Sequence, residues 1–259
     1  ARRGLAMTTT GRAPKQRAGQ QTTAQAIVLR RRDFRESSRI VTCMTREHGK
    51  ITGLAKGAHR PDSPLLGRID FLNELTASFS ADRGALRILV RAKLTRERRA
   101  LRTPQRFLAA GHIAWLVDVA SMEGRADPEL FDLLLGGLNL LERCPPETIP
   151  QVVLGLELRH LEAVGALPAF DSCSECGVAL NDQVFRQEET MGLACRQHAG
   201  LPRHPVLGDA MQLLRTLRAT SGRDWPGLGV GSETRAAATL TALWLAAAVE
   251  QRSPYRRLI

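Results

Sequence analysis

The sequence has few aromatic residues and no long apolar run, and both shortages limit what the chain can be. Only 4% of its 259 residues are aromatic, whereas Leu and Ala are abundant, which favours helices over much of the chain. The most apolar stretch, 240–249, is shorter than the roughly 18 residues that a membrane span needs. We therefore expect no membrane span and a cytoplasmic location.

Cysteine is also scarce, and the common enzyme motifs are absent. Five cysteines, an odd number, do not resemble the disulfide framework of a secreted protein. The sequence contains no GxxxxGK[ST], no GxGxxG after a strand, no HExxH and no GxSxG, the motifs that cradle phosphates or activate nucleophiles. We interpret His112 and His160 as ordinary core or surface histidines, and the acidic pairs of the second half as solvated. The sequence thus predicts that the protein is not an enzyme.

Acidic residues are in short supply only in the first part of the chain. Residues 1–102 hold 23 Lys and Arg against 8 Asp and Glu, whereas residues 103–259 hold 14 against 18. A base composition rich in Arg codons would raise Arg throughout, so it does not explain this asymmetry. A polyanion-binding first half explains it.

The chain divides into a leader and two folded parts. Residues 1–23 are rich in Arg, Thr and Gln and lack acidic residues, so we predict a disordered leader; Met7 favours an extension ahead of a start site over a transit peptide. Five short strand-like runs then fill 24–102, separated by turn signals at His48-Gly49 and at 82–84. This pattern is typical of a small barrel, either an OB-fold, which binds oligonucleotides, or an SH3-like barrel.

Helical periodicity replaces the strand pattern after Arg102, and an α-helical domain is predicted over 103–259. Pro104 and Pro128 mark helix starts, with Asp127 as an N-cap, and Gly165 marks a helix end. We expect helices from about 104, over 128–143 and 149–164, and then over 205–219 and 232–251. The predicted fold class is α+β multidomain, with an OB-fold barrel followed by a helical domain that carries an insertion at about 170–200.

The insertion contains the pattern of a zinc site. Cys173 and Cys176 form one pair with two intervening residues, and Cys195 and His198 form another. Each such pair offers two ligands from one tight turn, for which Gly177 and Gly192 are suited, and thiolates with imidazole suit tetrahedral Zn²⁺. Four protein ligands close the coordination shell, so we predict a structural rather than a catalytic zinc. The remaining cysteines, Cys43 and Cys144, are interpreted as core residues.

Basic side chains recur along the predicted barrel, where they can neutralise phosphates. In the fifth strand the odd positions 87, 91 and 93 are basic, so we expect them on one face with Ile88 and Val90 toward the core. Stacking aromatics are few, and Phe34 is the one we would test. The predicted DNA-binding residues are Arg30, Arg31, Arg32, Arg35, Arg39, Lys50, Lys56, Arg60, Arg87, Arg91 and Lys93.

Two stretches together carry a family resemblance. AIVLRRRDFRESSRIVTCMTREHGKITGLAKGAHRPDS, and ELRHLEAVGALPAFDSCSECG with GLACRQH, resemble the bacterial RecO family of recombination mediators. The resemblance implies an OB-fold and a helical domain, binding of single- and double-stranded DNA, strand annealing, and RecA loading with RecR in recombinational repair. It also implies a contact with the acidic C-terminal tail of the single-stranded-DNA-binding protein (SSB), for which the surroundings of Arg215 and Arg218 are a candidate place.

Two other functions stay open at this stage. The first is a nucleic-acid-modifying enzyme in which zinc activates water, with Glu175 or Glu188 as the nearby base. The second is an RNA-binding OB protein. The charge asymmetry fits all three functions, whereas the paired motifs favour the recombination mediator.

Overall fold

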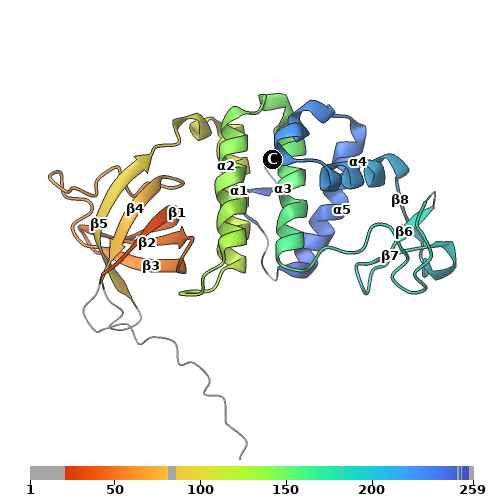
Figure 1. Cartoon of the computed structure of the whole chain (residues 1–259), viewed down its shortest axis with the longest axis horizontal. Coiled ribbons are helices and arrows are strands. Elements are labelled where there is room, and N and C mark those ends of the chain that lie inside the picture. Colours follow the sequence, from red (N-terminus) through yellow and green to blue (C-terminus); the bar gives the residue numbers. More distant parts are fainter. Residues whose placement is uncertain (1–20, 81–85, 182, 250, 252, 257–259) are drawn as a thin grey trace, which may run out of the picture.

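A five-stranded barrel and a helical domain lie side by side along the long axis of the molecule (Figure 1). The computed structural model describes residues 21–80, 86–181, 183–249, 251 and 253–256. Within these residues no helix is both long and apolar enough to cross a membrane. The predicted turn at 82–84 and most of the predicted leader lie outside the described residues, but Thr22 and Thr23, predicted as leader, open the first strand.

The barrel closes in the strand order β1-β2-β3-β5-β4, with β3 and β5 parallel and the other neighbours antiparallel. This Greek-key order is that of an OB-fold and decides against the SH3-like alternative. Gly49 opens β3 at φ +63°, as the turn requires. The strands are β1 (Thr22–Phe34), β2 (Ser38–Thr45), β3 (Gly49–Ala55), β4 (Glu74–Phe79) and β5 (Arg87–Arg96).

A bulge in β5 makes one predicted orientation wrong. Phe79 pairs with Leu89 and Ser78 with Arg91, which leaves Val90 as the extra residue. The inward positions therefore change parity along the strand: Leu89 and then Ala92 are buried, whereas Val90 is 48% exposed. Arg87, on the other side of the bulge, does not share the outward face that carries the basic positions 91 and 93.

Helices build the second domain around α3, which is buried along almost its whole length. Asp127 caps α2 by accepting a hydrogen bond from Leu130 N at 3.0 Å, as predicted. The predicted helix over 205–219 begins instead at Gly208, because residues 204–206 pair with β6 as a short strand. The helices are α1 (Pro104–Ala120), α2 (Pro128–Arg143), α3 (Ile149–Ala163), α4 (Gly208–Ala219) and α5 (Ser232–Ala248), and the strands of the insertion are β6 (Val184–Arg186), β7 (Leu193–Ala194) and β8 (His204–Val206).

The barrel and the helical domain share a hydrophobic core. Ile27, Leu29, Met44 and Leu72 lie on the barrel side of one buried cluster, which continues through α1, α2 and α3 to α4, α5 and the insertion. A separate cluster fills the barrel interior. Because β1 is buried on both of its faces over this stretch, the two domains are packed against each other rather than loosely linked.

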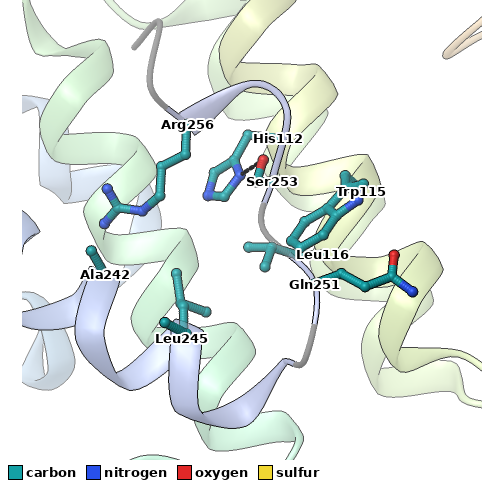
Figure 2. A pocket seen from close by; sticks show the side chains of 9 residues that line it. His112, Trp115, Leu116, Ala242, Leu245, Gln251, Ser253 and Arg256 are labelled. Atoms are coloured by element: carbon teal, nitrogen blue, oxygen red, sulfur yellow. Dashed lines mark hydrogen bonds between the residues drawn. The ribbon is translucent and has the colours of Figure 1, made fainter.

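One acidic side chain of the helical domain is not solvated, contrary to expectation. Glu157 on α3 is 1% exposed and accepts hydrogen bonds from Thr241 and Arg256, and its other oxygen lies 2.8 Å from His112 Nε2. His112 Nδ1 lies 2.8 Å from Ser253 Oγ, at the edge of a cavity of about 340 Å³ (Figure 2). This polar network fastens the C-terminal segment to α1 and α3 and satisfies the buried carboxylate.

Candidate metal centre and nucleic-acid interface

The structure brings the four predicted metal ligands to one point. Their ligand atoms all lie within 4.8 Å of one another. Cys176 Sγ lies 4.0 Å from Cys195 Sγ, and His198 Nδ1 lies 3.3 Å from Cys195 Sγ and 3.9 Å from Cys173 Sγ. Ligands about 2.3 Å from a tetrahedral Zn²⁺ are about 3.8 Å apart, so this group could hold one metal ion.

Backbone hydrogen bonds hold both ligand turns in place. Gly177 takes φ +70° and donates to Cys173 O, which closes the first turn. His198 N donates to Cys195 O in the second turn. Before the second pair the positive φ falls on Met191 (φ +55°), and Gly192 lies so close to Ser174 that a Cβ atom would be 2.9 Å from Ser174 Oγ.

The environment favours the thiolate form of Cys173 and Cys195. Although a hydrogen bond from Val178 N–H opposes this, burial and the thiols of Cys173 and Cys195 raise the pKa of Cys176. Burial opposes ionisation of Cys173, but hydrogen bonds from the backbone N–H groups of Cys195, Cys176 and Glu175 outweigh it and lower its pKa to about 6. A hydrogen bond with His198 lowers the pKa of Cys195. Thiolates are the form that binds metal. The lowered pKa values of Cys173 and Cys195 therefore agree with the arrangement of the four ligands as a metal site.

The metal-ligand group lies at the end of the molecule remote from the barrel (Figure 1). Its three-stranded sheet packs on α5, where Trp244 Nε1 donates to Met191 O and the Trp244 ring stacks on Phe170 at 5.4 Å. The proposed bases of the enzyme alternative are both engaged: Glu175 accepts from Gln187, and Glu188 pairs with Arg186 and His204. Both carboxylates therefore already have partners within the insertion, which does not favour either one as a base beside a metal-bound water.

The predicted DNA-binding residues separate into two groups in the structure. Six are exposed, and among the described residues they have no ion-pair partner. Lys56 and Arg60 follow β3, and Arg91 and Lys93 project outward from β5. The six residues that are exposed and have no ion-pair partner in the described part of the chain are Arg32, Arg35, Lys56, Arg60, Arg91 and Lys93.

The others take part in contacts within the protein. Lys50 Nζ donates to Asp118 O at 2.6 Å and pairs with the same residue's carboxylate, and Arg30 pairs with that carboxylate from the other side. Arg31 pairs with Asp70. Arg39 is held by Asp33 and His59, and Arg87 is half-buried. Arg30 and Arg31 are exposed despite their ion pairs. The structure therefore leaves fewer of the predicted residues unpaired than the sequence suggests.

Phe34, the aromatic residue that the sequence suggested testing for stacking, is the last residue of β1. The guanidinium of Arg35 covers its ring at 5.3 Å. Phe79, another barrel aromatic, is fully buried. Stacking surfaces must therefore be sought elsewhere in the chain.

Arg215 and Arg218 are occupied by contacts within the helical domain. Arg215 donates to the carbonyl oxygens of Phe170 and Leu180. Arg218 pairs with Glu162 at 2.7 Å and lies over the Phe170 ring. These two cations serve the packing of α4, which weakens their candidacy for binding an acidic tail.

A closed OB barrel packed on a helical domain with a Cys₃His group defines a two-domain OB-fold protein. The chain matches the family model described as "Recombination protein O N terminal" over residues 20–98 and the one described as "Recombination protein O C terminal" over 101–255. These models cover nearly the whole chain, which therefore belongs to the recombination protein O (RecO) family.

Curated relatives agree with the family models. A DNA repair protein RecO of Desulfitobacterium hafniense is 30% identical over 188 residues, 71% of this chain and 67% of the relative. Those of Myxococcus xanthus and Geobacter metallireducens are each 32% identical, over 75% and 77% of this chain and 79% and 81% of the relatives. The expected family is thus confirmed.

Proposed function

We propose that this protein is a non-enzymatic recombination mediator that acts in DNA repair in the bacterial cytoplasm. In this function it binds single- and double-stranded DNA, anneals complementary strands and assists RecA loading together with RecR. Family membership supports the role in repair and recombination. The observation that carries DNA binding is an OB barrel with six exposed cationic side chains that have no ion-pair partner among the described residues.

Annealing becomes possible when the protein binds DNA through its phosphates and independently of base sequence. Cationic side chains neutralise phosphates and release counterions, so two strands of any sequence can be held on the same surface. Base pairing between the strands then supplies the recognition. The protein needs no reacting group for this function.

The Cys₃His group suits a structural Zn²⁺. Four protein donors leave no coordination position for water, whereas a catalytic zinc keeps one open. The metal would then join the turn of Cys173 and Cys176, which precedes β6, to the turn of Cys195 and His198, which follows β7. Glu175 accepts a hydrogen bond from Gln187 and Glu188 pairs with His204, which favours a structural zinc over one that activates water.

An acidic tail such as that of SSB fits a groove between α2, α3 and the 3₁₀ turn Gly222–Leu228 better than it fits α4. This groove of about 650 Å³ is lined by apolar Leu133, Leu140 and Trp225 and by the cations Arg143 and Arg223. Both arginines are exposed. The R143E/R223E variant should lose at least tenfold in affinity for the tail peptide, measured by fluorescence anisotropy, and retain DNA binding; unchanged peptide affinity would place the tail elsewhere.

Annealing of labelled complementary strands across a salt series tests the proposed function. We expect annealing at low salt and a linear fall of log affinity with log salt concentration. The R91Q/K93Q variant should have a shallower salt slope. Absence of annealing and of salt dependence would refute the mediator function, and tighter binding of RNA than of DNA of the same sequence would support the alternative of an RNA-binding OB protein.

A further inference from the structure

A cleft of about 540 Å³ lies between the barrel and the helical domain at the surface. Its lining combines cations with aromatic rings. Arg30, Arg31 and Arg32 of β1 line one side. Residues of β2 and β3 contribute Ile40, Thr42 and Thr52. The volume is within the range of roughly 300–1,000 Å³ in which proteins bind small ligands or parts of larger ones.

The rings come from three distant parts of the sequence. Phe71 lies in the connection between β3 and β4, Phe107 in the first turn of α1, and Tyr255 in the C-terminal segment. Phe107 is 41% exposed and meets Phe71 edge to face, with centroids 5.6 Å apart and planes at 69°. An exposed, braced aromatic face beside cations is what a stacking site for a nucleic-acid base needs.

Gly111 on α1 allows Tyr255 to approach the cleft. A Cβ atom at this position would lie 2.8 Å from Tyr255 Cε1. The ring therefore rests directly on the helix backbone, and Ser253 and Arg256 hold the segment on either side through His112 and Glu157. The C-terminal segment is thus fixed where it can complete the cleft.

The charges of the cleft suit a phosphate beside a stacked base. None of the described residues that line it is acidic. Arg32 is exposed and has no partner among the described residues, whereas Asp118 and Asp70 pair with and orient Arg30 and Arg31. The geometry points to a binding site for single-stranded DNA between the two domains, in which Phe107 and Tyr255 stack on bases and Arg32 contacts phosphate.

This site rests on the proposed function and deepens it. It assigns the single strand to a surface made by both domains, with base contacts from the helical domain. Arg91 and Lys93 lie on β5, which pairs with β3 and β4 and not with β1. They therefore belong to a different part of the barrel wall, suited to phosphate contacts without stacking.

Two oligomers with the same phosphates test the site. We would measure affinity of the full-length protein for a labelled oligo(dT) and for an abasic oligomer of equal length. Stacking contributes about 1–3 kcal/mol per base, so F107L and Y255A should each weaken oligo(dT) binding about tenfold and leave abasic binding within twofold. F107L keeps apolar volume against Phe71, and Y255F should bind like the wild type because it keeps the ring.

Matched controls separate the possible outcomes. F34A, which removes an aromatic outside the cleft, should change neither affinity, and R32Q should weaken both oligomers alike. F107W should retain oligo(dT) binding, with tryptophan fluorescence quenched by oligo(dT) and not by the abasic oligomer. If wild-type protein binds both oligomers equally and F107L and Y255A change neither, the stacking site is refuted while DNA binding stands; if the wild type binds neither, the proposed function itself fails.

Discussion

At the scale of single residues, Lys50 and Lys93 distinguish a structural cation from a DNA-binding one. Lys50 is largely buried against Asp118, whereas Lys93 is exposed on β5. K50M should lower the free energy of unfolding by about 1–3 kcal/mol, because it leaves the buried Asp118 with fewer donors. K93M should leave stability unchanged and weaken DNA binding, as measured by urea unfolding and by anisotropy at fixed salt.

The two variants control for each other because both remove one lysine charge from the barrel. Equal loss of DNA affinity in stable K50M protein would contradict the structural role of Lys50. A destabilised K93M protein would contradict the exposed position of Lys93.

His160 on α3 makes the stability of the fold depend on pH. It is fully buried, and neither of its ring nitrogens has a hydrogen-bond partner among the described residues. Burial, aided by the nearby His112, lowers its pKa to about 4. Between pH 6.5 and 4 the unfolded chain therefore binds a proton that the folded chain does not, so stability is complete above this window and is lost as pH falls through it.

The H160L variant isolates this contribution. The difference in free energy of unfolding between variant and wild type should shift by about 2 kcal/mol in favour of the variant from pH 7 to pH 5. Urea unfolding at the two pH values measures it. Parallel pH profiles would show that His160 takes up its proton as readily in the folded protein as in the unfolded chain, and that its pKa is not lowered.

Residue patterns could predict the metal ligands but not the interdomain cleft. Two ligands on one tight turn leave a local signature, and Cys173 and Cys176 show it plainly. Phe107 and Tyr255 have no such signature, because their meeting depends on how α1 and the C-terminal segment pack on the barrel. The ion pair of Lys50 could not be predicted either, because its partner Asp118 lies on a helix of the other domain.

At the scale of elements, the strands and most helices could be predicted because their signals are local, whereas the pairing order of the strands came from the structure. Gly49 and Asp127 act within a few residues of themselves, as expected. The bulge at Val90 was missed, because an extra residue in β5 is defined by its partner strand and not by its own sequence. The strand at 204–206 was missed for the same reason, as it forms only through pairing with β6.

The insertion that carries β6, β7 and β8 should depend on its metal. Short strands of two or three residues have little stability of their own, so ligation would supply much of their order. Chelation, or the C173S variant, should increase hydrogen exchange and protease cleavage over about 171–206 and leave the barrel unaffected. Elemental analysis should give one zinc per wild-type chain.

E175Q and E188Q provide the matched controls, since both carboxylates lie in the insertion without being ligands. Both variants should retain zinc and protection from protease. Zinc loss in either one would show that a carboxylate takes part in coordination and would reopen the enzyme alternative.

At the scale of the whole molecule, the shared core implies that the barrel does not unfold independently of α1 to α3. Ile27 and Leu29 on β1 pack into the cluster of the helical domain. The side chain of Arg98, at the end of the barrel, is 1% exposed and pairs with Glu74 of β4 and Glu142 of α2. An isolated 24–102 fragment would expose this apolar surface and lack Phe107 and Tyr255, so we expect it to bind DNA more weakly than the full-length protein.

The L75A variant tests this coupling from inside the barrel. Leu75 is 1% exposed and belongs to the separate barrel cluster, so truncation should cost about 2–5 kcal/mol. If the domains unfold together, native-state hydrogen-exchange protection of the most protected amides should fall in α1 and α3 as well as in β1 to β5. Loss of protection confined to the strands would show two independent units, and the cleft between them would then vary in width instead of forming a fixed binding site.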